Sequence, residues 1–101
     1  MDRVIRDGRV AVLYSPGWGS GWFSSHHVKE LIFDPSIVQW LENNERDKIQ
    51  NYLTLKYPDI YLGGLENLTI RWVLAGSIFR IDEYDGNESI ILKEEDDWLM
   101  A

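Results

Sequence analysis

Residues 10–27 read VAVLYSPGWGSGWFSSHH, and they join an apolar run to a glycine-rich loop. Apolar side chains stand at both odd and even positions of residues 10–14, which predicts a β-strand covered on both faces. After Pro16 the loop holds three glycines, two tryptophans and a phenylalanine. Because ordering a glycine costs more backbone entropy than ordering any other residue, we interpret residues 16–27 as a binding loop that leaves directly from the core.

This loop supplies most of the residues that we expect to bind a small, nucleotide-like ligand. The rings of Trp18, Trp22 and Phe23 would stack on a flat ring, and the glycine amides would donate to phosphate or ribose oxygens. The loop has no Lys or Arg, so the positive charge would come from Arg71 or Arg80. The predicted ligand-binding residues are Gly17, Trp18, Gly19, Ser20, Gly21, Trp22, Phe23, Ser24, His26, Arg71 and Arg80.

The sequence contains no complete catalytic, nucleotide-binding or metal-binding motif. A dinucleotide fingerprint needs a glycine where Trp22 stands, and a Walker loop needs the sequence Gly-Lys-Ser/Thr. His26 and His27 are adjacent, so on a strand they would face opposite ways and would not both hold one metal. We expect a non-enzymatic protein without catalytic residues, cofactor or metal, and a general base at His26 or His27 is the enzymatic alternative.

Outside the loop, the sequence predicts strands joined by glycine turns. Asp7-Gly8 is a typical type I′ turn pair and predicts a hairpin that ends near residue 15. Residues 68–74 alternate in the manner of a strand with Leu68 and Leu74 on one face. Turns at Ala75-Gly76 and Asp85-Gly86 predict that this strand and the two after it form an antiparallel meander.

Two helices are expected between these groups of strands. Asp34 is a good N-cap and Pro35 suits the first helical position, which predicts a helix start there. A second helix is expected from about residue 45 to residue 56, before Pro58, and residues 28–33 are predicted to be a short strand. The expected fold class is α+β, with a single antiparallel sheet, made of the N-terminal hairpin and the C-terminal meander, and a two-helix hairpin packed on one face.

The composition predicts one domain, residues 1–101, with more aromatic side chains than its core can enclose. The chain holds five tryptophans and five tyrosines in 101 residues, and a domain this small buries only about 60–65% of its unfolded surface. Some aromatic surface would therefore face a ligand, a partner protein or a second copy of the chain. The sequence has no cysteine, no N-terminal signal segment and no apolar run near the roughly 20 residues of a membrane span, so we expect a cytoplasmic protein that does not bind membranes.

Acidic residues concentrate in residues 82–97, which hold eight acids and one base, a net −7 that equals the charge of the whole chain. Direct binding to nucleic acid is not expected, because phosphates require clustered Lys or Arg. As the alternative to ligand binding, this acidic edge would contact and inhibit a basic protein. The predicted partner-binding residues are Asp82, Glu83, Asp85, Glu94, Glu95, Asp96 and Asp97.

Four sequence segments resemble a family of short proteins encoded by tailed bacteriophages and prophages. They are VAVLYSPGWGSGW from Val10, ELIFDPSIV from Glu30, YLGG from Tyr61 and FRIDEYDGNESI from Phe79. The resemblance implies an accessory protein that acts in the cytoplasm of the host, with no established reaction or cofactor. It further implies a role against host defences, by capturing a nucleotide signal or by blocking a defence protein.

Overall fold

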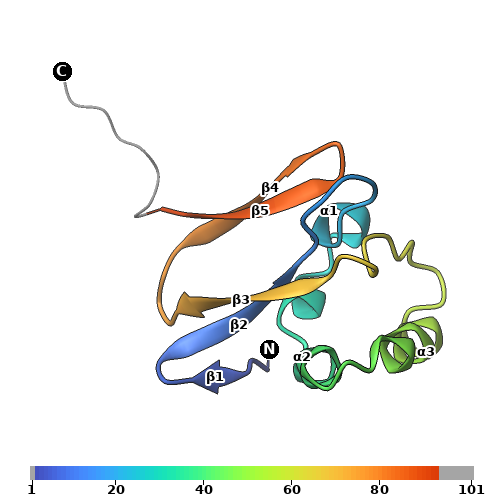
Figure 1. Ribbon diagram of the computed structural model, residues 1–101, viewed down its shortest axis with the longest axis horizontal. Helices are drawn as coiled ribbons and strands as arrows, with labels where there is room; N and C mark the ends of the chain where they lie inside the picture. The colour runs from blue at the N-terminus through green and yellow to red at the C-terminus, as the bar shows by residue number, and fades with distance from the viewer. Residues whose placement is uncertain (1, 94–101) are drawn as a thin grey trace.

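The strands form two antiparallel sheets, and two of the helices lie beside the larger sheet (Figure 1). The computed structural model describes residues 2–93 of the chain. In chain order the elements are β1 (Ile5–Arg6), β2 (Arg9–Tyr14), α1 (Phe23–His26), the 3₁₀ helix η1 (Lys29–Ile32), α2 (Pro35–Glu42), α3 (Arg46–Lys56), β3 (Thr69–Leu74), β4 (Phe79–Tyr84) and β5 (Asn87–Leu92). This arrangement confirms the α+β class. None of the helices described is long and apolar enough to cross a membrane.

Strand β2 is the central strand of the larger sheet. It pairs with β1 on one edge and with β3 on the other, and both pairings are antiparallel. The turn before it has positive φ at Asp7 (50°) and Gly8 (74°), as the sequence predicted. Three consecutive residues, Ala11, Val12 and Leu13, are fully buried, which confirms that this strand is covered on both faces.

The prediction of a single sheet was wrong, because β4 and β5 form a separate two-stranded sheet. Strand β3 pairs with β2 and does not pair with β4. The turn after β3 is closed by a hydrogen bond from Ser77 N–H to the carbonyl of Leu74, with Gly76 at a φ of 87°. Beyond this turn the chain leaves the plane of the first sheet and lies over it as the β4–β5 hairpin (Figure 1).

The helix starts and ends follow the sequence closely. Asp34 Oδ1 accepts hydrogen bonds from the backbone N–H groups of Ser36 (2.9 Å) and Ile37 (3.2 Å), so it caps α2 as predicted. Helix α3 ends at Lys56, two residues before Pro58. The strand predicted for residues 28–33 was wrong, since this segment forms η1 with local bonds such as Leu31 N–H to the Val28 carbonyl. A short apolar run suits either structure.

The core lies between β2, the short helices and the inner faces of α2 and α3. Its largest buried side chain is Trp22, from the glycine-rich loop. Ile37 and Val38 of α2, and Ile49 and Leu53 of α3, complete it from the helical side. Because Trp22 belongs to the core, the loop that follows β2 is fixed both where it begins and in its middle.

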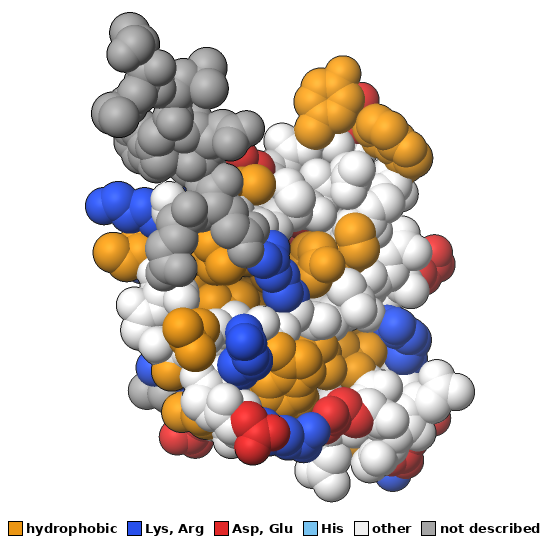
Figure 2. All heavy atoms as spheres, turned by 60° about the vertical axis from the view of Figure 1, so that its left-hand side comes forward, with side chains coloured by type: hydrophobic (Ala, Val, Ile, Leu, Met, Phe, Trp, Pro, Cys, Tyr) orange, Lys and Arg blue, Asp and Glu red, His pale blue; other side chains and the backbone are white. Residues whose placement is uncertain are grey.

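A hollow of about 390 Å³ lies between the N-terminal segment, the end of β3 and the start of β4. Mostly hydrophobic side chains line it, among them Val10, Phe33 and Phe79. Figure 2 shows hydrophobic side chains gathered on this side of the molecule, with basic and acidic side chains among them. Basic groups cover part of this surface, since the Arg3 guanidinium lies 4.5 Å from the ring centroid of Phe33.

Candidate functional site

The glycine-rich loop is attached to the β4–β5 hairpin by hydrogen bonds of its backbone. Gly17 N–H donates to Asn87 Oδ1 (2.8 Å), and Gly19 N–H donates to the carbonyl of Asp85 (3.3 Å). Glu88 N–H donates to the carbonyl of Ser15 (3.0 Å) at the start of the loop. These contacts join segments about seventy residues apart in sequence, and they use two of the glycine amides that the sequence suggested for phosphate.

Two glycines permit backbones to cross closely at this attachment. A Cβ atom on Gly86 would lie 1.3 Å from the carbonyl oxygen of Gly19, and one on Gly64 would lie 2.7 Å from the carbonyl carbon of Gly21. Both glycines also have positive φ. Gly64 and Gly86 therefore serve chain packing, because a side chain at either position would overlap the backbone of the loop.

A buried carboxylate, Glu88, holds the two ends of the loop. The side chain is 1% exposed. Its Oε1 accepts from Ser15 N–H at 2.9 Å, while its Oε2 accepts from both the N–H and the hydroxyl of Ser24 at 2.8 Å. Since Ser24 lies in the single turn of α1, these bonds join β5 to that turn.

Glu88 was not among the residues predicted from the sequence to form a site, and it was counted only in the net charge of residues 82–97. Its position in β5 was the available indication. Glu88 and Ile90 lie on the same face of the strand, and both are buried. An acid in register with apolar residues points inward and needs hydrogen-bond donors there.

Trp22 does not take the ligand-stacking position that the sequence predicted for it. Its indole has no exposed surface, and its Nε1–H donates to the carbonyl of Leu31 at 2.9 Å. The ring also packs edge-to-face against His26, with 4.9 Å between centroids. A large amphipathic ring with its single donor satisfied is stable in a core, so Trp22 is a structural residue.

Trp18, by contrast, stands on the surface with 68% of its area exposed. Its neighbour is Tyr84, at the end of β4, which is 71% exposed. The two rings meet edge to face, with centroids 5.9 Å apart. We call this pair the aromatic tip. Asp82, Glu83 and Asp85 lie beside it in the sequence of the hairpin, and Glu83 Oε1 accepts from Gly86 N–H at 2.8 Å.

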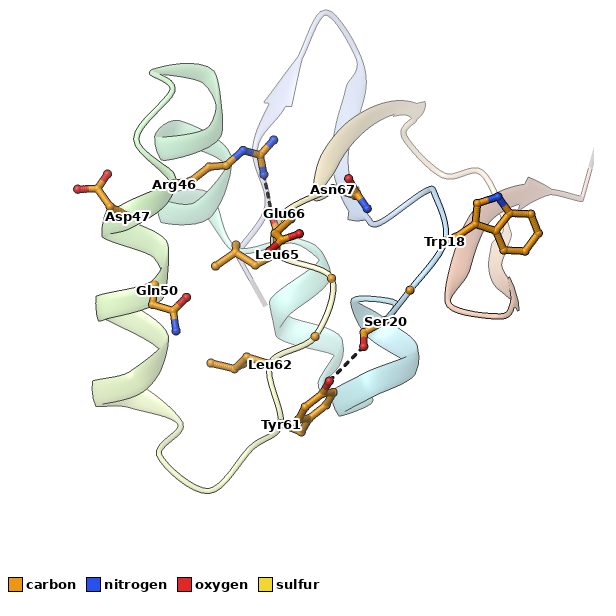
Figure 3. A pocket seen from close by; sticks show the side chains of 13 residues that line it. Trp18, Ser20, Arg46, Asp47, Gln50, Tyr61, Leu62, Leu65, Glu66 and Asn67 are labelled. Carbon is orange, nitrogen blue, oxygen red and sulfur yellow. Dashed lines mark hydrogen bonds between the residues drawn. The ribbon is translucent and has the colours of Figure 1, made fainter.

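A cavity of about 530 Å³ lies on the other side of the loop, between residues 18–20, α3 and residues 61–67 (Figure 3). The Gln50 side chain points into it from α3. The hydroxyls of Ser20 and Tyr61 are hydrogen-bonded to each other at 3.1 Å on its wall. The indole of Trp18 points away from this cavity (Figure 3), although Trp18 is among the residues that line it, so the aromatic tip and the cavity adjoin at this residue.

The other predicted ligand-binding residues are not gathered in the cavity. Arg71 donates to the carbonyl of Ile90 at 2.9 Å, and Arg80 pairs with Asp82 at 2.9 Å on the β4–β5 hairpin. Gly17, Gly21, Phe23, Ser24 and His26 also lie outside the lining of the cavity, whereas Trp18, Gly19 and Ser20 belong to it.

His26 lies partly buried behind the loop. Its Nδ1 accepts from Val28 N–H at 2.8 Å, and its Nε2 is buried without a hydrogen-bond partner among residues 2–93. Burial lowers the pKa of His26 to about 4, although the charge of Glu88 acts in the opposite direction. The imidazole is therefore neutral near pH 7.

The acidic edge is only partly within the described residues. Asp82, Glu83 and Asp85 lie on the β4–β5 hairpin, whereas Glu94, Glu95, Asp96 and Asp97 lie outside the part of the chain that the structure describes. Within residues 2–93, His, Asp and Glu side chains form no group of three or more that could hold a metal ion.

Comparison with known proteins gave no match to a family model, a curated protein or a solved structure. The grounds for a functional proposal are therefore the aromatic tip, the charges beside it and the cavity.

Proposed function

We propose that this chain is a non-enzymatic protein-binding module whose aromatic tip docks on a basic surface of a partner protein. The exposure of Trp18 and Tyr84 carries this proposal, since two large rings stand in solvent side by side on a protein of 101 residues. Tryptophan and tyrosine are the residues most enriched among those that dominate binding energy at protein interfaces.

The anchoring of the tip supports the same function. Trp18 lies between Gly17 and Gly19, whose amides are both bonded to the β4–β5 hairpin. Tyr84 lies on the same hairpin, next to Asp85. Because the backbone is held in place before binding, association would have to order little more than the two side chains of the tip. The entropy cost of association on this side of the interface is therefore small.

The charge beside the tip indicates the chemistry of the partner. Asp82, Glu83 and Asp85 surround Tyr84 in the sequence, with Arg80 as the basic residue paired to Asp82. Acids around an aromatic centre favour a partner with Lys and Arg around an apolar pocket, and they accelerate encounter at low salt. The resemblance to short phage proteins suggests a host protein, and binding would then inhibit it in the host cytoplasm.

The nucleotide-like ligand predicted from the sequence is a weaker proposal on this geometry. Trp22 is buried, and the amides of Gly17 and Gly19 already have acceptors within the chain. What favours a small-molecule function is the cavity of about 530 Å³, which lies within the usual size range of ligand sites.

The aromatic tip is tested by comparative affinity capture from a bacterial lysate, followed by calorimetry with the purified captured protein. The Trp18→Ala, Tyr84→Ala double variant should bind at least about 100-fold more weakly, because two central aromatic anchors are removed. Affinity of the unaltered chain should also fall as salt rises.

Leu55→Ala is the control, since Leu55 is an apolar side chain on α3, outside the tip, and is 85% exposed, more than either ring of the tip. It should leave affinity unchanged. Equal capture by the double variant and the unaltered chain would contradict the proposal.

A further inference from the structure

The cavity behind the loop has the groups of a small-molecule site. It is lined on one side by α3 and on the other by residues 61–67, with Ser20 reaching it from the loop (Figure 3). Tyr61 supplies a ring that is 66% exposed, and Leu62 supplies apolar surface. A site with an apolar wall and a few polar groups that converge on it is the usual architecture for binding a small ring-containing ligand.

Amide and hydroxyl groups make up the uncharged polar lining. Gln50 projects from α3 into the space, and Asn67 lines it at the end of the opposite segment (Figure 3). A side-chain amide offers a donor and an acceptor together, which matches the paired donor and acceptor on the edge of adenine. The Ser20 and Tyr61 hydroxyls can each exchange their mutual bond for one to a ligand hydroxyl.

The charges of the lining disfavour an anion. Arg46 is the one basic residue among the lining residues, and both terminal nitrogens of its guanidinium donate to backbone carbonyls, those of Leu65 (2.8 Å) and Leu68 (2.9 Å). Asp47 and Glu66 line the same cavity, so its charged residues sum to −1. The Asp47 carboxylate points away from the cavity (Figure 3), so a phosphate would meet the acidic residue Glu66 and a cation already engaged with the protein.

We infer that this cavity binds an uncharged nucleoside, with the base against Tyr61, its edge on the Gln50 amide and the ribose hydroxyls near Ser20. The side chains assigned to the ligand here, Gln50, Tyr61 and Ser20, are not part of the aromatic tip, and the Trp18 ring points away from the cavity although Trp18 lines it (Figure 3). The inference also reverses the charge expectation of the sequence, which was for a phosphate-bearing ligand.

Titration of the full chain with adenosine and with ATP, followed by backbone amide NMR, tests the inference. Adenosine should give saturable shifts at Gln50, Tyr61 and Gly63, and ATP should bind at least about tenfold more weakly. Absence of shifts at millimolar adenosine would overturn the assignment, and equal or tighter binding of ATP would overturn the charge argument on which it rests.

A pair of glutamine variants assigns the binding to the cavity. Gln50→Leu should weaken adenosine binding at least about tenfold, whereas Gln39→Leu, an exposed glutamine on α2, should leave it unchanged. Both positions are exposed, and thermal unfolding checks that both variants fold. Ser20→Ala provides a second lining variant with the same expectation. Unchanged adenosine affinity in both Gln50→Leu and Ser20→Ala would refute the site, whatever the outcome for the aromatic tip.

Discussion

At the scale of single residues, Glu88 links β5 to both ends of the glycine-rich loop. A carboxylate that accepts three hydrogen bonds while 1% exposed is stable only because those donors are present. Removing the acceptor leaves the buried N–H of Ser15 and the partly buried N–H of Ser24 without their hydrogen-bond partner. Leaving these donors unpaired carries a free-energy penalty in the folded state, so Glu88 contributes to the stability of the fold.

We expect Glu88→Ala to lower the free energy of unfolding by about 3 kcal/mol, because it removes the acceptor for three hydrogen bonds and a buried side chain. Glu88→Gln should lower the free energy of unfolding by less, since its amide oxygen can still accept the hydrogen bonds made by one of the two carboxylate oxygens. Urea unfolding measures both, with Glu30→Ala, an exposed acid of η1, as the control. Equal stability of Glu88→Ala and Glu30→Ala would show that the carboxylate contributes nothing.

His26 should make the protein less stable in acid. Its pKa is lowered by burial to about 4 in the folded chain, against 6.5 ordinarily. Between these pH values the unfolded chain binds more protons than the folded one. The free energy of unfolding therefore keeps its full contribution from His26 above about pH 6.5 and falls as the pH drops toward 4. Unfolding free energies measured from pH 7 to pH 4 should show this decline.

The variant that isolates this effect is His26→Asn, whose side-chain oxygen can still accept from Val28 N–H. Its stability should depend less on pH over the same interval. His27→Asn is the control, because His27 has a left-handed φ of 58° that asparagine tolerates. If His26→Asn and the unaltered chain decline in parallel, the buried imidazole is not the cause.

At the scale of elements, the turn between β4 and β5 is locked against the glycine-rich loop. Gly86→Ala should destabilise the protein by about 3 kcal/mol or more, since the added methyl group would lie 1.3 Å from the Gly19 oxygen. Gly8→Ala is the matched control, with a similar φ of 74° and open space around it. It should cost about 1 kcal/mol, the strain of left-handed backbone alone.

Thermal and urea unfolding compare the two alanine variants. The difference between them measures the close crossing of the two backbones, because both turns carry the same conformational strain. Equal free energies of unfolding for Gly86→Ala and Gly8→Ala would contradict the close contact between Gly86 and the backbone of Gly19.

Strand β3 shows how far a local pattern determines an element. Its existence and approximate extent were predicted, but burial does not follow a single face along the strand, since Leu68 and Val73 are buried and Leu74 is 52% exposed. Leu74 pairs with Arg9 at the end of the ladder, where the sheet offers little cover. Alternation predicts two faces, and only the neighbouring elements decide which residues of a face are covered.

At the scale of the whole molecule, the second sheet is held by a few long-range contacts. The β4–β5 hairpin meets the rest of the chain through Ser15, Gly17 and Gly19, and Arg71 donates to the carbonyl of Ile90. This placement puts Tyr84 beside Trp18 and brings part of the acidic segment to the aromatic tip. The proposed binding surface is therefore a product of how the two sheets are joined.

The sequence by itself determined the α+β class, the turns at Asp7-Gly8 and Asp85-Gly86, the Asp34 cap and the burial of β2. Each of these depends on residues a few positions apart, whose conformational preferences act locally. Tertiary structure alone decided that Trp22 is core while Trp18 is surface, that Glu88 is buried, and that the strands divide into two sheets. The physical reason is that burial depends on contacts between segments up to seventy-three residues apart, as from Ser15 to Glu88, which no local pattern encodes.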